Sequence, residues 1–115
     1  MIVTIKQNDT YPDLRARLQM RTGKTIRIEG AEIRLILMDE NDNIHLNKMC
    51  TIENAIEGYV SYRWLPQDTA TAGEYRAEFE VKWANGSIVT VPNDGYFTVN
   101  IVKELGGSLI ENTPI

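Results

Sequence analysis

The residues of this chain that could perform chemistry are few and widely spaced. His45 is the single histidine and Cys50 the single cysteine. A Cys–His pair needs both side chains within hydrogen-bond reach, but a separation of five residues sends them to opposite faces of one strand. We therefore predict no catalytic residue, with His45 in a surface turn and Cys50 as a small buried apolar side chain.

The run from Asp39 to Asn43 has the spacing of the first ligands of a calcium loop, with oxygen-bearing side chains at alternate positions. The pattern then breaks, because Ile44 replaces the glycine of the sharp turn and Cys50 replaces the bidentate glutamate. No Cys/His cluster has zinc spacing, and no glycine-rich loop leads into a helix. We expect a polar hairpin turn and neither metal nor cofactor, with a weak surface ion as the alternative.

Composition sets broad limits on the class of protein. The 115 residues are 43% hydrophobic and 24% charged, typical of one soluble domain. Twelve basic and 16 acidic residues give a net charge of −4, which argues against nucleic-acid and membrane partners. The first residues lack the long apolar region of a secretory signal, so we expect a protein that stays in the cytoplasm until it is used. One cysteine excludes an internal disulfide.

The element that must organise the chain is residues 74–83, EYRAEFEVKW. Its odd positions are apolar and its even positions are all charged, which indicates a half-buried β-strand. Other short apolar runs are separated by turn signals, such as Asn85-Gly86, which favours a tight antiparallel hairpin. Together they predict an all-β sandwich. The predicted strands are residues 2–7, 14–19, 25–28, 32–39, 51–54, 59–65, 73–83, 87–91 and 96–102.

Large apolar side chains on these strands should form the core. Tyr75 has a further role, because it follows Gly73 by two residues at the start of a strand, the layout of a tyrosine corner. Its hydroxyl should bind backbone a few residues upstream, and Ala77 stands where an immunoglobulin domain has cysteine. The predicted core and corner residues are Leu35, Tyr62, Trp64, Tyr75, Phe79, Trp83 and Phe97.

The predicted strand 32–39 is apolar on both faces. Leu35 and its neighbours two residues away share one face, whereas Ile36 and Met38 lie on the other. Such a strand is either covered on both sides or carries an interface on its second face. Beyond residue 102, glycines interrupt the pattern, so we predict a domain over 1–102 and a flexible tail or docking arm over 103–115. The candidate interface residues are Ile36, Met38, Leu109 and Ile110.

Several of these segments resemble one known family. The strand GYVSYRW at 58–64, then Asp68-Thr69, then GEYRAEFEV at 73–81, are similar to the N-terminal domain of baseplate upper proteins from phages and prophages of Gram-positive bacteria. The segments 33–38, 90–92 and 96–101 extend the resemblance over roughly residues 1–102.

The resemblance implies an immunoglobulin-like antiparallel β-sandwich of about seven to nine short strands. It also implies a non-enzymatic structural or assembly protein of a phage or prophage tail or baseplate. Such a protein acts as a scaffold or adaptor, binds other tail proteins, forms a homo-oligomer, and resides in the virion tail after synthesis in the bacterial cytoplasm. The alternative is a carbohydrate- or protein-binding immunoglobulin-like module of a bacterial cell surface, which predicts an export route and a concave aromatic patch.

Overall fold

Two β-sheets pack face to face in the computed structural model, which describes residues 1–105. The all-β sandwich agrees with the sequence prediction, and its nine strands lie within the expected seven to nine, although not all at the predicted positions. The candidate contacts at Leu109 and Ile110 lie outside the described residues, as does most of the predicted tail. The elements are β1 (Ile2–Lys6), β2 (Leu14–Arg17), β3 (Glu32–Met38), β4 (Ile44–Met49), β5 (Thr51–Asn54), β6 (Tyr59–Tyr62), the 3-10 turn η1 (Pro66–Asp68), β7 (Gly73–Lys82), β8 (Ile88–Val91) and β9 (Phe97–Val102).

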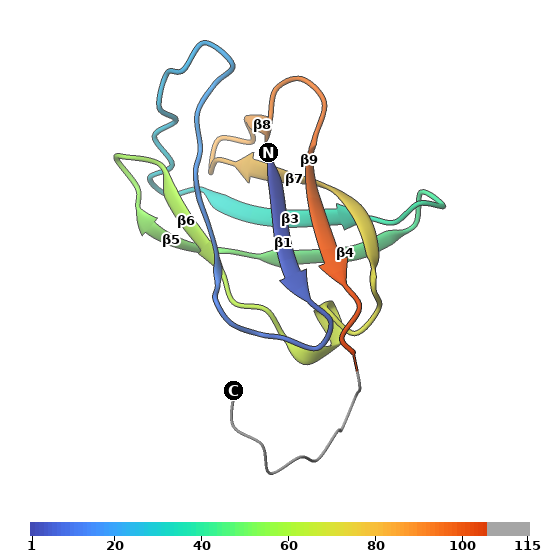
Figure 1. Ribbon diagram of the computed structural model, residues 1–115. Helices are drawn as coiled ribbons and strands as arrows, with labels where there is room; N and C mark the ends of the chain where they lie inside the picture. Colours follow the sequence, from blue (N-terminus) through green and yellow to red (C-terminus); the bar gives the residue numbers. More distant parts are fainter. Residues whose placement is uncertain (106–115) are drawn as a thin grey trace.

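The larger sheet has the order β1-β9-β7-β3-β4, and β8 also pairs with β7 (Figure 1). β7 is the long central strand, and β3 pairs along one of its edges. Along the other edge, β9 pairs with the first half of β7 and β8 with the second half. All pairs are antiparallel except β1 with β9. The smaller sheet is β2-β6-β5, and only Cys50 separates β4 from β5, so the chain passes from one sheet to the other at that residue.

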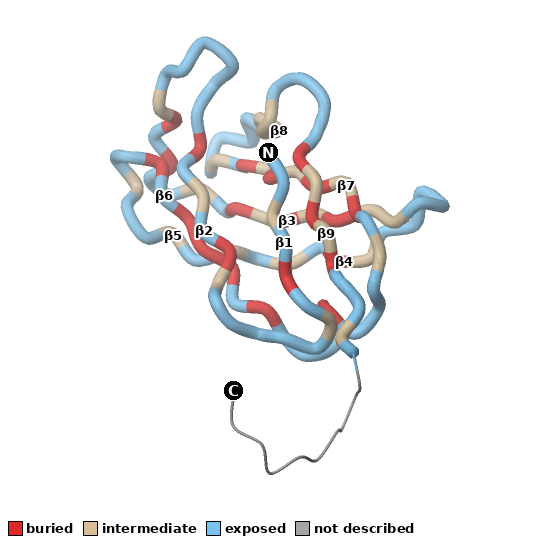
Figure 2. The backbone as a smooth tube through the Cα atoms, viewed as in Figure 1, coloured by how far each residue is buried: buried red, intermediate tan, exposed pale blue. Residues whose placement is uncertain are grey.

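The period-two pattern of β7 has the predicted consequence. Its apolar side chains, including Phe79 and Val81, are buried, whereas Glu74 and Lys82 at its ends are exposed. Buried and less buried residues alternate along the large sheet (Figure 2). The turn at Gly86, where φ is +90°, joins β7 to β8 in the predicted antiparallel hairpin.

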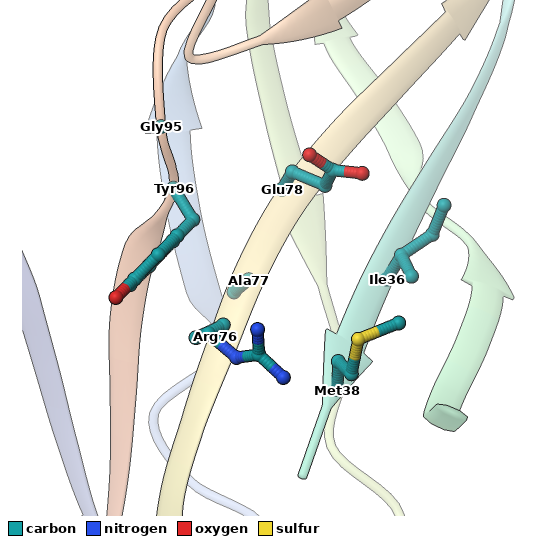
Figure 3. Close-up of a pocket in the computed structure, with 7 residues that line it drawn as sticks. All are labelled: Ile36, Met38, Arg76, Ala77, Glu78, Gly95 and Tyr96. Atoms are coloured by element: carbon teal, nitrogen blue, oxygen red, sulfur yellow. The ribbon is translucent and has the colours of Figure 1, made fainter. Parts of the chain in front are cut away.

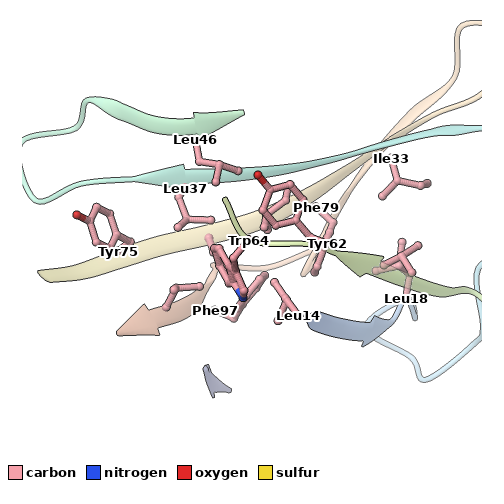
Figure 4. Close-up of a cluster of buried hydrophobic side chains, with 14 of the residues drawn as sticks. Leu14, Leu18, Ile33, Leu37, Leu46, Tyr62, Trp64, Tyr75, Phe79 and Phe97 are labelled. Carbon is pink, nitrogen blue, oxygen red and sulfur yellow. The ribbon is translucent and has the colours of Figure 1, made fainter. Parts of the chain in front are cut away.

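The core lies between the two sheets (Figure 4). Tyr62 and Trp64 approach from the smaller sheet, with rings 5.4 Å apart in edge-to-face contact. Phe79 and Phe97 stack with ring centres also 5.4 Å apart on the larger sheet. These rings dominate the buried apolar area. Trp83 is only half-buried at the margin, where its indole nitrogen donates to the Arg27 carbonyl oxygen at 3.2 Å.

One predicted strand does not form and one strand was not predicted, for different reasons. Residues 25–28 form no strand: Ile26 and Ile28 are buried, but their N–H groups donate to backbone carbonyls of Leu18 and Ala55 in irregular connections. In contrast, β4 was not predicted, because its apolar residues Ile44, Leu46 and Met49 do not alternate regularly and its pairing with β3 has a register shift. Apolar residues can be buried in irregular segments that form no strand, and an edge strand need not show a regular period-two pattern.

Candidate interaction surface

His45 and Cys50 are not brought together as a catalytic pair. His45 lies in β4 rather than in the predicted turn, and its Nε2 donates to the Asp68 carbonyl oxygen at 2.7 Å. Its ring also lies 4.5 Å from that of Tyr75. Cys50 is half-buried between β4 and β5, and desolvation raises the pKa of its thiol to about 12. The thiolate that a nucleophile requires is therefore disfavoured.

The carboxylate of Asp39 is used inside the β3–β4 turn. Its Oδ1 accepts hydrogen bonds from the backbone N–H groups of Asn41 and Asn43, both at 2.9 Å. This is the polar hairpin turn that the sequence predicts. Within residues 1–105, no group of three or more His, Cys, Asp or Glu side chains is placed to hold a metal ion. The same residues contain no helix that is long and apolar enough to span a membrane.

Asp68 organises a buried polar cluster that the sequence did not reveal. Its Oδ2 accepts from the Tyr62 hydroxyl at 2.6 Å and from the Leu65 backbone N–H at 2.8 Å. Lys48 places its Nζ 3.6 Å from Oδ1. Since Lys48 and His45 both reach η1 from β4, this cluster ties the larger sheet to the turn that leaves the smaller one. Its role is structural.

Tyr75 has the geometry of a tyrosine corner. Its ring is buried, and its hydroxyl donates to the Thr71 carbonyl oxygen at 2.7 Å, four residues upstream. Burial raises the pKa of this hydroxyl, with the nearby carboxylates of Asp39 and Glu40 adding to the effect. The neutral, hydrogen-bonding form is therefore retained at ordinary pH. The bond fixes the chain where it enters β7.

The outer face of the larger sheet carries apolar side chains. Ile36 and Met38 are half-buried on the side of β3 that points away from the core, as their sequence positions indicate. Ile44 and Met49 of β4 lie opposite Met38 and Arg34 in the ladder, and they are 55% and 48% exposed. We call Ile36, Met38, Ile44 and Met49 the outer patch. Of the two alternatives for this face, the first does not hold, because no other layer within residues 1–105 covers it.

A hollow of about 130 Å³ lies on the same face between β3 and the start of β9 (Figure 3). Ile36 and Met38 form one wall and the ring of Tyr96 the other, with the backbone of Ala77 at the base. Arg76 and Glu78 project from β7 between the two walls. The lining residues are Ile36, Met38, Arg76, Ala77, Glu78, Gly95 and Tyr96.

The comparisons with known proteins agree with this fold. The family model described as the BppU N-terminal domain, for baseplate upper protein, matches residues 2–114. The chain belongs to this family. Among solved structures, the N-terminal domain of phage TP901-1 ORF48 superposes with a TM-score of 0.61 at 17% identity, over 91% of this chain and 86% of that chain. No match is found among curated protein sequences.

A second solved structure has the same general fold. CopC from Methylosinus trichosporium OB3b gives a TM-score of 0.53 at 12% identity, over 90% of this chain and 86% of that one. Identities this low establish the fold alone. Membership in the BppU N-terminal family confirms the resemblance found in the sequence, and it makes this domain a structural part of a phage tail baseplate.

The sequence therefore located only half of this candidate surface of the BppU N-terminal domain. Ile36 and Met38 were identified from the two-faced pattern of one strand. In the sequence, Arg76 and Glu78 belong to the charged face of residues 74–83, and Tyr96 is an aromatic residue next to a turn glycine. No local signal unites them, because they come from strands separated by up to 60 residues.

Proposed function

We propose that this domain is a non-enzymatic scaffold or adaptor of a phage tail baseplate that binds other tail proteins through the outer face of its larger sheet. One observation carries the proposal: the outer patch keeps four large apolar side chains on the face opposite the core. Exposed contiguous apolar surface is typical of protein–protein contact sites. Its two methionines are flexible and adapt to partner shape.

Self-association is part of the proposal. β1 and β4 end the larger sheet, and β2 and β5 end the smaller one. The free backbone donors and acceptors of such edges can pair with a second copy. We further propose that the protein is made in the bacterial cytoplasm and then incorporated into the virion tail.

The cell-surface alternative has less support. Tyr11, Tyr59 and Tyr96 are the exposed tyrosines, and they fall on different elements: the β1–β2 connection, strand β6 of the smaller sheet and the β8–β9 connection. A sugar-binding face needs such rings on one concave surface.

The test is binding to the products of adjacent tail genes, measured by co-purification and by light scattering. Ile44→Lys is the test variant and Ile56→Lys the matched control, because both isoleucines are 55% exposed and only Ile44 belongs to the outer patch. We expect Ile44→Lys to abolish complex formation and Ile56→Lys to leave it intact. A protein that stays monomeric at high micromolar concentration and binds no tail protein would overturn the proposal.

A further inference from the structure

We propose that the hollow lined by Ile36 and Tyr96 receives one aliphatic side chain from a partner protein, and that a basic residue stands beside this side chain in the partner. The inference deepens the proposed function, on which it rests, by naming the chemistry of the partner segment. The shape of the hollow indicates the aliphatic side chain, and its charge indicates the basic neighbour.

The shape suits a branched aliphatic group. The walls are the apolar side chains of Ile36 and Met38 and the flat ring of Tyr96, and the backbone of β7 at Ala77 lies beneath, since the Ala77 side chain faces the core. The volume of about 130 Å³ is near the roughly 150 Å³ of an apolar cavity that holds a benzene molecule. Gly95, with φ of +78°, makes the turn that brings Tyr96 over β7, and a Cβ there would meet open space. A leucine or isoleucine side chain would fill this space and lose its contact with water.

The cation at the hollow is already neutralised. Arg76 forms an ion pair with Asp42 and donates to the Asp39 carbonyl oxygen at 3.1 Å. Its guanidinium carbon also lies 6.0 Å from the centre of the Tyr96 ring. These contacts fix the Arg76 side chain beside the Tyr96 ring, and its positive charge is balanced by Asp42 within the domain. An acidic partner residue would gain little from it.

The anion at the hollow is not neutralised. Glu78 lies opposite the apolar Ile36 in the ladder, and it takes part in none of the ion pairs found among residues 1–105. The next carboxylate on this face, Glu80, lies opposite Arg34 and does not line the hollow. Glu78 therefore leaves one uncompensated negative charge at the hollow. Complementary charge favours a partner with Lys or Arg next to its aliphatic side chain and disfavours Asp or Glu there.

The test uses three short peptides with blocked ends and backbone amide NMR shifts of the full chain. The first is Gly-Lys-Leu-Lys-Gly, the second replaces both lysines with glutamates, and the third replaces leucine with serine. We expect saturable shifts at Ala77, Glu78, Gly95 and Tyr96 with the first peptide at millimolar concentration. The second and third should bind about threefold to fivefold more weakly, the scale of one exposed ion pair or of a small apolar contact.

Variants separate charge from shape. Glu78→Gln should remove the preference for lysine over glutamate in the peptide and keep the preference for leucine over serine. Ile36→Ala should remove the preference for leucine over serine and keep the preference for lysine over glutamate. Ile88→Ala is the control, since Ile88 is an exposed isoleucine on β8 that does not line the hollow. The amide spectrum of each variant reports whether it is folded.

Three results would overturn the inference: absence of saturable shifts at the hollow, equal binding of all three peptides, or shifts at the hollow that grow with protein concentration alone. The last would identify a second copy as the occupant. If discrimination is lost while tail proteins still bind, only the inference fails. If discrimination holds while no tail protein binds, the proposed function fails instead.

Discussion

The buried carboxylate of Asp68 offers the sharpest test of how this fold is held together. The side chain is 4% exposed and accepts hydrogen bonds from the Tyr62 hydroxyl and the Leu65 N–H, with the Lys48 ammonium at 3.6 Å. Asp68→Ala removes the acceptor and leaves the Tyr62 hydroxyl and the Leu65 N–H without a partner. Asp68→Asn keeps an acceptor oxygen of nearly the same shape for these two donors, but it removes the charge and replaces the other carboxylate oxygen with an amide NH2 group.

The two substitutions should therefore differ in cost. A hydrogen bond to a charged group contributes about 1.5–3 kcal/mol, and Asp68 accepts two such bonds, from the Tyr62 hydroxyl and the Leu65 N–H. We expect Asp68→Ala to lower the free energy of unfolding by about 3–5 kcal/mol. Asp68→Asn should cost about 1–2 kcal/mol, because both bonds remain but become neutral. For a chain of this size each kcal/mol lowers Tm by roughly 4 °C.

Urea denaturation followed by fluorescence measures both values, provided that the slope with denaturant stays constant. Asp94→Asn is the control: its side chain is 77% exposed and should change stability by less than about 0.5 kcal/mol. If Asp68→Ala costs less than about 1 kcal/mol, or if the Asn and Ala variants cost the same, the hydrogen-bonded cluster does not stabilise the fold as argued.

Three further predictions follow from single contacts. Tyr75→Phe should lower the free energy of unfolding by about 1 kcal/mol, the net value of one hydrogen bond, because the exposed Thr71 carbonyl oxygen can bind water instead. An unchanged denaturation midpoint would show that this hydrogen bond does not stabilise the fold. Cys50 should react with iodoacetamide at pH 8 about two to three orders of magnitude more slowly than a free thiol, because its pKa is raised from 9.0 to about 12, and a rate equal to that of glutathione would contradict this. Gly58→Ala should destabilise far more than Gly86→Ala on thermal melting: both have positive φ, but only at Gly58 would a Cβ meet two backbone carbonyl oxygens, at 2.8 and 2.9 Å. Equal melting temperatures for the two variants would show that the backbone around residue 58 shifts to accommodate the added Cβ.

Local chemistry was enough to determine the sandwich. The alternation in 74–83 forces one face of β7 inward whatever its neighbours are, and Asn85-Gly86 fixes the hairpin that follows. The spacing around Tyr75 also located a hydrogen bond that depends only on residues four positions apart. Such features can be read from a sequence because their causes lie within a few residues.

The tertiary structure decided what depends on distant segments. Residues 25–28 read as a strand, but no neighbour is placed to complete a ladder there, whereas β4 becomes a strand because β3 supplies its partners. Ile36 and Met38 could have been covered or free, and only the sheet order leaves them outside. The hollow exists because β3, β7 and the turn before β9 lie side by side. The charge of Glu78 has no cross-strand partner there, because the residue opposite it on β3 is the apolar Ile36. A sequence specifies which face each side chain takes, but the packing of separate strands determines what that face meets.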